Sequence, residues 1–365
     1  MSSKPKVLYM GHPIMYAHEE WLSFKEKFDI VSYDVQSREE AMKAFAEGGK
    51  YSDVEAIMRP SLASNILPSL DEELVQSLPS SLKIISYCNH GYDGEDTEAL
   101  ERRGIWYCNG AGGATSATAD IALFLILAVF RYTTFCEAVL RDNKSADWFL
   151  VEDVVMASHD PAGHVLGIIG MGGIGEAVAR RARSLGMNIH YHNRKRRPET
   201  EAALGDAVFH DTIESLLRVT DCIVVACPHT PNTHHLLNEK TLRFMKRGSR
   251  VVNVGRGKII DEAALVAALE DGHISSAGLD VFYDEPVVHP SLLDNKKVAL
   301  LPHMAGGTLS SNKNFEAIAM QNLVRYFFED GKPLTPINNA SSSCSRSCVD
   351  KGRWPARIRS LHQLF

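Results

Sequence analysis

A glycine-rich turn between an apolar strand and a helix constrains the fold of this chain more than any other feature. Residues 170–175 read Gly-Met-Gly-Gly-Ile-Gly, after the apolar run 165–169 and before a helical stretch over 176–185. An unbroken apolar run is typical of a parallel strand buried on both faces. Backbone N–H groups and the helix dipole at such a turn can bind a pyrophosphate, so the context favours a dinucleotide site over a purely structural turn. The residues expected to contact the dinucleotide are Gly170, Gly172, Gly173, Ile174 and Gly175.

The end of the next expected strand indicates which dinucleotide would bind. In a site for NAD, an acidic residue at this point holds the adenosine ribose. Here the strand ends in Asn193, Arg194 and Lys195, followed by two further arginines. Because the paired N–H donors of an arginine attract a 2′-phosphate, NADP(H) is preferred and NAD(H) stays possible. A solvated basic turn without a ligand is the alternative interpretation.

Short apolar strands alternate with helical stretches along most of the chain, which predicts two parallel-sheet α/β domains of the Rossmann or flavodoxin type. The first set of strands is expected at 7–10, 30–33, 56–58 and 82–87 and has no glycine-rich loop. The second set is expected at 165–169, 187–192, 207–209, 222–227, 250–254, 276–281 and 298–301, which suits a doubly wound sheet. One long helix is expected over 117–141 and another over 309–328, the second followed by the helix-stop residues Gly331 and Pro333.

Composition narrows the classes of function. The 365 residues carry 39 Lys and Arg against 45 Asp and Glu, a net charge of -6, which argues against nucleic acid or an anionic membrane as the main partner. The longest apolar run, 121–130, is too short to cross a bilayer, and no targeting segment is indicated at the start. Seven cysteines without a Cys-x-x-Cys pair favour reduced thiols in the cytoplasm. The expected ligand is a small molecule.

For two further segments a structural interpretation is preferred to a functional one. Residues 339–365 form a Ser- and Cys-rich tail with five basic residues and one acidic residue, and a disordered extension is preferred to a basic interaction arm. His190 and His192 alternate on one expected strand, but no third ligand falls at a recognisable spacing, so no metal site is expected.

Three polar residues follow later strands of the second expected sheet and are the candidates for catalysis. They are Arg256 between two glycines, Glu285 before a proline, and His303 after a proline. Ligands bind beyond the carboxyl ends of the strands in such sheets, so the three side chains can converge on one site. Each residue alone also suits an ordinary loop position.

The chemistry of these three residue types suits reduction of a ketone. A carbonyl that accepts a hydride develops negative charge on its oxygen, so catalysis needs a proton donor and a cation beside it. His303 is the expected donor, and an ionised Glu285 would hold the imidazole tautomer and favour its protonated form. Arg256 would bind both the substrate carboxylate and the carbonyl oxygen.

From about residue 7 to 338 the chain resembles the D-2-hydroxyacid dehydrogenases, especially the branch of fungal glyoxylate/hydroxypyruvate reductases and D-mandelate dehydrogenase. The segments that carry the resemblance are 170–175, 227–233, 245–248, 253–257 with Asp261, 278–282, 285–286 and 302–303. The resemblance implies a reductase that transfers a hydride from NADPH to a small 2-oxo acid, either glyoxylate or hydroxypyruvate or a bulkier one, and forms the D-2-hydroxy acid. It also implies that Arg256, Glu285 and His303 are the catalytic residues.

The same resemblance implies the rest of the site and its surroundings. Asp280 would hold the nicotinamide amide, and the other implied cofactor contacts are Thr118, Pro228, His229, Thr230, Val254, Gly255, His303 and Gly306. The substrate domain would comprise 1–109 and 307–338, with the cofactor domain 110–306 inserted into it, and a homodimer would form through the cofactor domain. A dinucleotide-sensing corepressor of the same fold is the alternative function.

One departure from the family pattern concerns the loop that holds the substrate carboxylate. The family commonly has Gly-x-Gly here, whereas this chain has Asn89, His90 and Gly91. The backbone amides of His90 and Gly91 are still expected to bind the carboxylate. Asn89 is expected to narrow the pocket or to need an unusual backbone angle, which would alter the accepted side chain.

Overall fold

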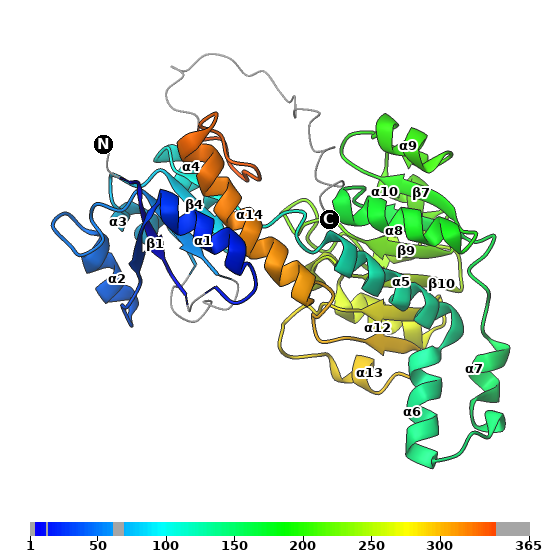
Figure 1. The fold of residues 1–365 in the computed structure, drawn as a ribbon. Helices are drawn as coiled ribbons and strands as arrows, with labels where there is room; N and C mark the ends of the chain where they lie inside the picture. The colour runs from blue at the N-terminus through cyan, green and yellow to red at the C-terminus, as the bar shows by residue number, and fades with distance from the viewer. Residues whose placement is uncertain (1–3, 12–13, 61–68, 341–365) are drawn as a thin grey trace.

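Two parallel sheets organise the chain, and each belongs to an α/β domain, as the sequence predicts (Figure 1). The computed structural model describes residues 4–11, 14–60 and 69–340. The residues of the expected tail beyond Ala340, including Cys344 and Cys348, lie outside the described residues. The five described cysteines are free thiols.

The first sheet has the strand order β2-β1-β3-β4-β5, which is the order of flavodoxin-like folds. Its strands are β1 Lys6–Tyr9, β2 Asp29–Ser32, β3 Ala56–Arg59, β4 Ile84–Tyr87 and β5 Trp106–Cys108. Alternate residues of each strand face opposite sides, so Leu8 and Ile57 belong to one core cluster while Val7 and Ala56 belong to another. The sequence pattern missed β5, because three residues are too few to show a period.

Helices cover both faces of this sheet. Helices α2 Arg38–Phe45, α3 Glu72–Ser77 and α4 Thr97–Arg102 supply residues to the first cluster. Helices α1 His18–Lys27 and α14 Leu309–Phe328 supply residues to the second. The expected bounds of α14 are confirmed. It begins where Thr308 caps the N–H of Ser311, and it packs on β3 and β4 of the first sheet.

The second sheet has the order β12-β11-β10-β9-β6-β7-β8, and every pair in it is parallel. Its strands are β6 Val165–Ile169, β7 Asn188–His192, β8 Val208–His210, β9 Cys222–Val225, β10 Ser249–Asn253, β11 Ile274–Leu279 and β12 Val298–Leu300. This order is the doubly wound Rossmann order with a seventh strand, and it reverses between β6 and β9. A ligand site is expected beyond the carboxyl ends of those two strands.

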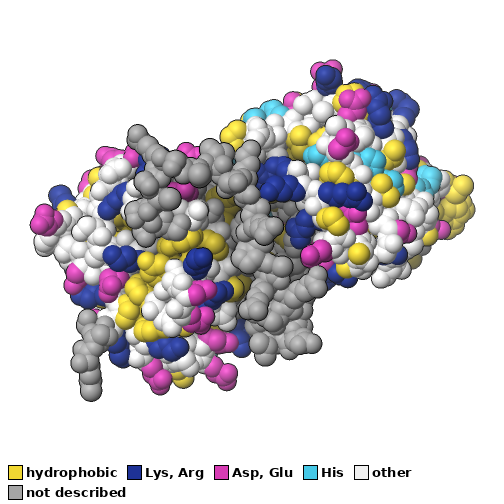
Figure 2. Space-filling view, turned by 90° about the horizontal axis from the view of Figure 1, so that it is seen from above, with side chains coloured by type: hydrophobic (Ala, Val, Ile, Leu, Met, Phe, Trp, Pro, Cys, Tyr) yellow, Lys and Arg dark blue, Asp and Glu magenta, His cyan; other side chains and the backbone are white. Residues whose placement is uncertain are grey.

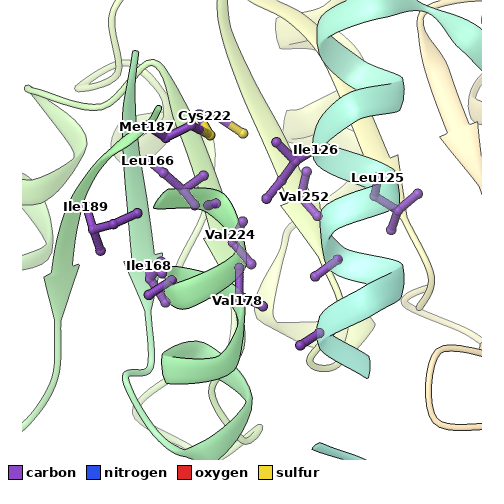
Figure 3. Packing of buried hydrophobic residues seen from close by; sticks show 14 of the residues in the cluster. Leu125, Ile126, Leu166, Ile168, Val178, Met187, Ile189, Cys222, Val224 and Val252 are labelled. Carbon is purple, nitrogen blue, oxygen red and sulfur yellow. The ribbon is translucent and has the colours of Figure 1, made fainter. Parts of the chain in front are cut away.

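Two layers of helices enclose the second sheet. Helices α5 Thr115–Arg131 and α8 Gly173–Ser184 cover one face, and Figure 3 shows Ile126 of α5 beside Val252 and Val178 of α8 beside Val224. The opposite face is covered by α10 Ile213–Leu217, α11 Glu239–Leu242 and α12 Glu262–Glu270. Short segments complete the domain: α7 Glu152–Met156, α9 Pro198–Leu204, α13 Pro290–Leu293, and the 3-10 turns at Trp148–Val151 and Gly257–Ile259.

The prediction of a single helix over 117–141 is wrong. This part of the chain forms two helices, α5 and α6 Thr133–Asn143, which meet at 72° where Tyr132 takes a φ of 51°. In a continuous helix the carbonyl of Val129 would accept the N–H of Thr133. Here that carbonyl instead accepts from Arg250 Nε at 3.3 Å and Ser276 Oγ at 2.8 Å, so distant residues end the helix.

In the described part of the chain, no single helix is long and apolar enough to cross a membrane. Helices α5 and α6 reach that length only when they are counted together, across the bend at Tyr132.

We expect Glu316 of α14 to contribute strongly to the stability of the first domain. Its buried carboxylate accepts the backbone N–H groups of Met15, Tyr16 and Ala17 at 2.7–3.1 Å. Glu316→Ala leaves these donors without an acceptor and should lower the free energy of unfolding by about 3 kcal/mol in urea titrations. The exposed Glu329→Ala is the control and should change it by less than about 0.5 kcal/mol. Equal effects of the two variants would contradict this role.

Candidate active site

The glycine turn after β6 has the conformation that a phosphate-binding loop needs. Gly170 takes a φ of +101°, and a Cβ there would lie 2.8 Å from the carbonyl oxygen of Ala226. A Cβ at Gly175 would lie 2.1 Å from the carbonyl oxygen of Gly170, so both positions require glycine. A Cβ at Gly172 would meet nothing within 4 Å, which leaves open space at the start of α8. The turn therefore fits a dinucleotide phosphate.

The residues after β7 present positive charge beside this turn. Asn193 Oδ1 accepts the N–H of Met171 at 3.0 Å, which ties the end of β7 to the glycine turn. Arg194 and Lys195 are exposed, and neither forms an ion pair within the described residues. Arg196, in contrast, pairs with Glu201 at 2.8 Å.

The loop after β9 is held by a threonine that sequence reasoning did not single out. Thr233 Oγ1 accepts the N–H of Thr230 at 2.7 Å and donates to the carbonyl of Pro228 at 2.8 Å. His229 lies in the same loop, with its Nε2 at 3.2 Å from Nδ1 of His234. The predicted contact residues 228–230 therefore share one ordered turn.

The remaining predicted cofactor residues lie around the same edge of the sheet. Thr118 is buried on α5, and its Oγ1 lies 3.8 Å from where a Cβ would stand at Gly306. The loop after β10 contains buried Val254, and Gly255 donates its N–H to Asn253 Oδ1 at 3.0 Å.

Glu285 and His303 are brought together although 18 residues separate them. His303 Nδ1 lies 2.7 Å from Glu285 Oε2, and Glu285 Oε1 accepts the N–H of Phe282 at 2.9 Å. The second ring nitrogen, Nε2 of His303, is therefore the one left for a ligand. The two side chains are 46% and 35% exposed, so solvent or a ligand can reach them.

Asp280 organises the loop that carries His303. Its backbone carbonyl accepts the N–H of His303 at 2.7 Å, and its carboxylate accepts the N–H groups of Met304 and Ala305 at 2.8 and 3.0 Å. These bonds hold His303 at a φ of 52°, a conformation that is uncommon outside glycine. Burial raises the pKa of Asp280, and the two backbone donors oppose that rise.

Arg256 joins the two domains. Its Nε donates to Asp93 Oδ2 at 2.7 Å, and its Nη1 donates to the carbonyl of Gly255 at 2.7 Å. A Cβ at Gly91 would lie 2.2 Å from Nη2 of Arg256, so the glycine lets the guanidinium approach the backbone of the first domain.

Asn89 does not take the unusual backbone angle that the sequence suggests. Among the described residues, the non-glycine residues with positive φ are Tyr132, Lys144, His235 and His303. Instead, Asn89 Oδ1 accepts the N–H of His90 at 2.8 Å. The sequence predicts that this N–H binds the substrate carboxylate, but here it is already engaged by Asn89. Burial lowers the pKa of His90, and the charge of Arg256 lowers it further.

A cavity of about 500 Å³ brings the predicted residues of both domains together. Asn89, Gly91, Arg256 and His303 all line it. Sequence reasoning missed the other lining residues, which are Arg59, Ser69, Tyr87, Tyr92, Asp93 and Glu95. Arg59 could have been found from the sequence, because a charged residue at the carboxyl end of an apolar strand lies where ligands bind.

Within the described residues, no group of three or more His, Cys, Asp or Glu side chains could hold a metal ion. His190 Nδ1 instead lies 2.9 Å from His210 Nε2 across neighbouring strands.

The comparisons with known proteins indicate one family. The family model for the D-isomer specific 2-hydroxyacid dehydrogenase NAD-binding domain matches residues 123–305. The 4-methyl-2-oxopentanoate reductase A of Aspergillus oryzae is 37% identical over 91% of this chain and 98% of its own length.

Two solved structures extend the likeness to the whole fold. The apo D-mandelate dehydrogenase of Rhodotorula graminis is 37% identical, with a TM-score of 0.87 over 92% of this chain and 98% of that one. The NADPH-dependent glyoxylate/hydroxypyruvate reductase of Sinorhizobium meliloti, solved with NADP and malonate, is 30% identical, with a TM-score of 0.73. The match covers 95% of this chain and 100% of that one. These relatives do not favour the corepressor alternative. The chain belongs to the D-isomer specific 2-hydroxyacid dehydrogenases, a family of oxidoreductases with an NAD-binding domain.

Proposed function

We propose that this enzyme reduces short 2-oxo acids to D-2-hydroxy acids and prefers NADPH to NADH. The observation that carries the proposal is the shared cavity, which Arg256 and His303 of one domain line together with Asn89 and residues 91–93 of the other. Glyoxylate is the simplest substrate of this class and the first to test. Spectrophotometric oxidation of NADPH in the presence of glyoxylate tests the proposal directly, and no turnover with any 2-oxo acid would refute it.

The dinucleotide would be held by the glycine turn, the 228–230 loop and the residues around Asp280. Gly172 leaves room for the pyrophosphate, and exposed Arg194 and Lys195 can bind a 2′-phosphate without losing an existing ion pair. When bound, the reduced nicotinamide supplies a hydride to the carbonyl carbon. The Sinorhizobium meliloti reductase, solved with NADP, supports the preference for the phosphorylated cofactor.

Arg256 would bind the substrate carboxylate and stabilise the charge that develops on the carbonyl oxygen. The Gly91 N–H is the second proposed donor to the carboxylate, because the His90 N–H already donates to Asn89. His303 would transfer the proton on Nε2 to the oxygen, so that the carbonyl becomes a hydroxyl. Glu285, in contact with Nδ1, would keep the ring in the required tautomer and stabilise its positive charge.

We also infer how the protein is assembled. Helix α14 packs on β3 and β4, which supports a substrate domain of 1–109 and 307–338 around a cofactor domain of 110–306. Figure 2 shows hydrophobic side chains gathered at one end of the molecule, and the segment 148–156 exposes Trp148, Phe149 and Met156 by 49%, 65% and 76%. Such exposure favours a homodimer through the cofactor domain. The free thiols favour a cytoplasmic location.

His303→Gln should lower kcat for glyoxylate by about 10²–10⁴, because the amide cannot supply the proton. His18 is exposed on α1, away from the cavity, so His18→Gln is the control and should keep wild-type kinetics. A His303→Gln enzyme with wild-type kcat would remove the residue from the mechanism.

Arg194→Ala should raise the KM for NADPH by roughly tenfold or more and leave the KM for NADH within about twofold, since only NADPH carries the 2′-phosphate. The measurement compares both cofactors at saturating glyoxylate. Arg218→Ala is the control, because Arg218 is an exposed arginine that pairs with Glu214. Equal effects of Arg194→Ala on the two cofactors would contradict phosphate binding by this residue.

A further inference from the structure

A carboxylate outside the interdomain cavity holds the loop that carries Glu285. Glu262 is the first residue of α12, and its Oε1 accepts the N–H of Tyr283 at 2.6 Å. The N–H of the preceding residue, Phe282, donates to Oε1 of Glu285 at 2.9 Å. Two carboxylates therefore bind successive N–H groups of one loop, and the second of them contacts His303.

The peptide group between Phe282 and Tyr283 is fixed at both ends. Its N–H donates to the carboxylate on α12, and a Cβ at Gly257 would lie 1.7 Å from its carbonyl oxygen. Gly257 directly follows Arg256 in the chain. The loop that carries Glu285 is thus held against the segment that begins at Arg256.

The backbone beside Glu262 is itself anchored. Asp261 caps α12 by accepting the N–H of Ala264 at 3.2 Å, and its own N–H donates to the carbonyl of Leu237 at 2.8 Å. A charged acceptor forms a stronger hydrogen bond than a neutral one. The carboxylate of Glu262 therefore has both the fixed position and the charge to hold the loop.

Glu262 does not belong to the cavity that contains Arg256 and His303. It lines a second cavity of about 350 Å³, together with His235 and Tyr283. A substrate held by Arg256 and His303 would not touch Glu262. Any effect of Glu262 on the reaction would therefore pass through the loop that it binds.

We propose that Glu262 is a positioning residue for proton transfer, because it holds Glu285 in contact with His303. It acts through the N–H of Tyr283, and this inference rests on the proposed function. Without the acceptor on α12, the Phe282 N–H loses its alignment with Glu285, and the imidazole loses its fixed partner. A displacement of about 1 Å near reacting groups can cost roughly a hundredfold in rate.

Two substitutions separate the hydrogen bond from the charge. Glu262→Met removes the acceptor, whereas Glu262→Gln keeps an oxygen that can accept the N–H of Tyr283. With glyoxylate and NADPH, Glu262→Met should lower kcat by roughly tenfold to a hundredfold and leave the KM for glyoxylate within about twofold, since Arg256 keeps its own partners. Glu262→Gln should keep kcat within about threefold of the wild type. Equal losses in the two variants would indicate a charge effect at the start of α12 and overturn the inference.

The same substitution in a Glu285→Gln background shows whether Glu262 acts through Glu285. If it does, adding Glu262→Met should lower kcat by no more than about twofold further. The matched control is Glu239→Met, because Glu239 is exposed and is also the first residue of a helix after its capping residue. This control should keep wild-type kinetics. A full loss from Glu262→Met in the Glu285→Gln background would overturn the inference.

Nuclear magnetic resonance gives a readout that needs no turnover. The ring ¹⁵N signals of His303, assigned by their absence in His303→Gln, report which nitrogen carries the proton when the ring is neutral. Nδ1 should carry it in the wild type and in Glu262→Gln, and Glu262→Met should give a mixture of the two tautomers. Unchanged signals in Glu262→Met would overturn the positioning role.

The outcomes separate this inference from the proposed function. A wild type that reduces no 2-oxo acid overturns the proposed function, and the ¹⁵N comparison then decides by itself whether Glu262 positions the ring. If Glu262→Met does not fold, Glu262→Asp takes its place, because it draws the carboxylate back by one methylene group. Its kcat should fall several-fold, and an unchanged kcat would overturn the inference.

Discussion

The contact between Nδ1 of His303 and Oε2 of Glu285 is the interaction on which the proposed chemistry depends. It joins two loops at the carboxyl edge of the second sheet and leaves Nε2 of His303 as the nitrogen that can exchange a proton with a ligand. The contact needs His303 in a left-handed backbone conformation, which Asp280 maintains through one carbonyl and two carboxylate hydrogen bonds. A buried carboxylate thus sets the orientation of a partly exposed histidine.

The site is complete only where the two domains meet. The second sheet supplies Arg256 and His303, whereas the first supplies the loop after β4, and the bond from Arg256 to Asp93 crosses between them. Parallel sheets collect their carboxyl-terminal loops at one edge, so two such edges facing each other form a cavity with chemically different walls. One wall holds the groups proposed for substrate binding and proton transfer, and the other carries the buried ion pair of Arg59 and Glu95.

Much of the second domain is predictable from the sequence, because its central strands β6 and β9 are buried and read as unbroken apolar runs ahead of recognisable loops. The glycine turn and the approach of Glu285 to His303 are also predictable, because loops that follow parallel strands gather at the carboxyl edge of the sheet. The break at Tyr132 is not predictable in this way, since the side chains that bind the carbonyl of Val129, Arg250 and Ser276, lie 121 and 147 residues beyond Val129 in the chain. The Arg59–Glu95 pair and the hydrogen bond from His90 to Asn89 also depend on how separate loops pack, which local patterns do not encode.

A double-mutant cycle on Glu285 and His303 tests the central contact most directly. It compares kcat for glyoxylate, at saturating NADPH, in the wild type, Glu285→Gln, His303→Gln and the double variant. If Glu285 acts through the imidazole, the double variant should be no more than about threefold slower than His303→Gln alone, because residues that act as a unit are strongly non-additive. If the fold losses in kcat of the two single variants multiply in the double variant, the two side chains act independently. That result would contradict the proposed role of the contact.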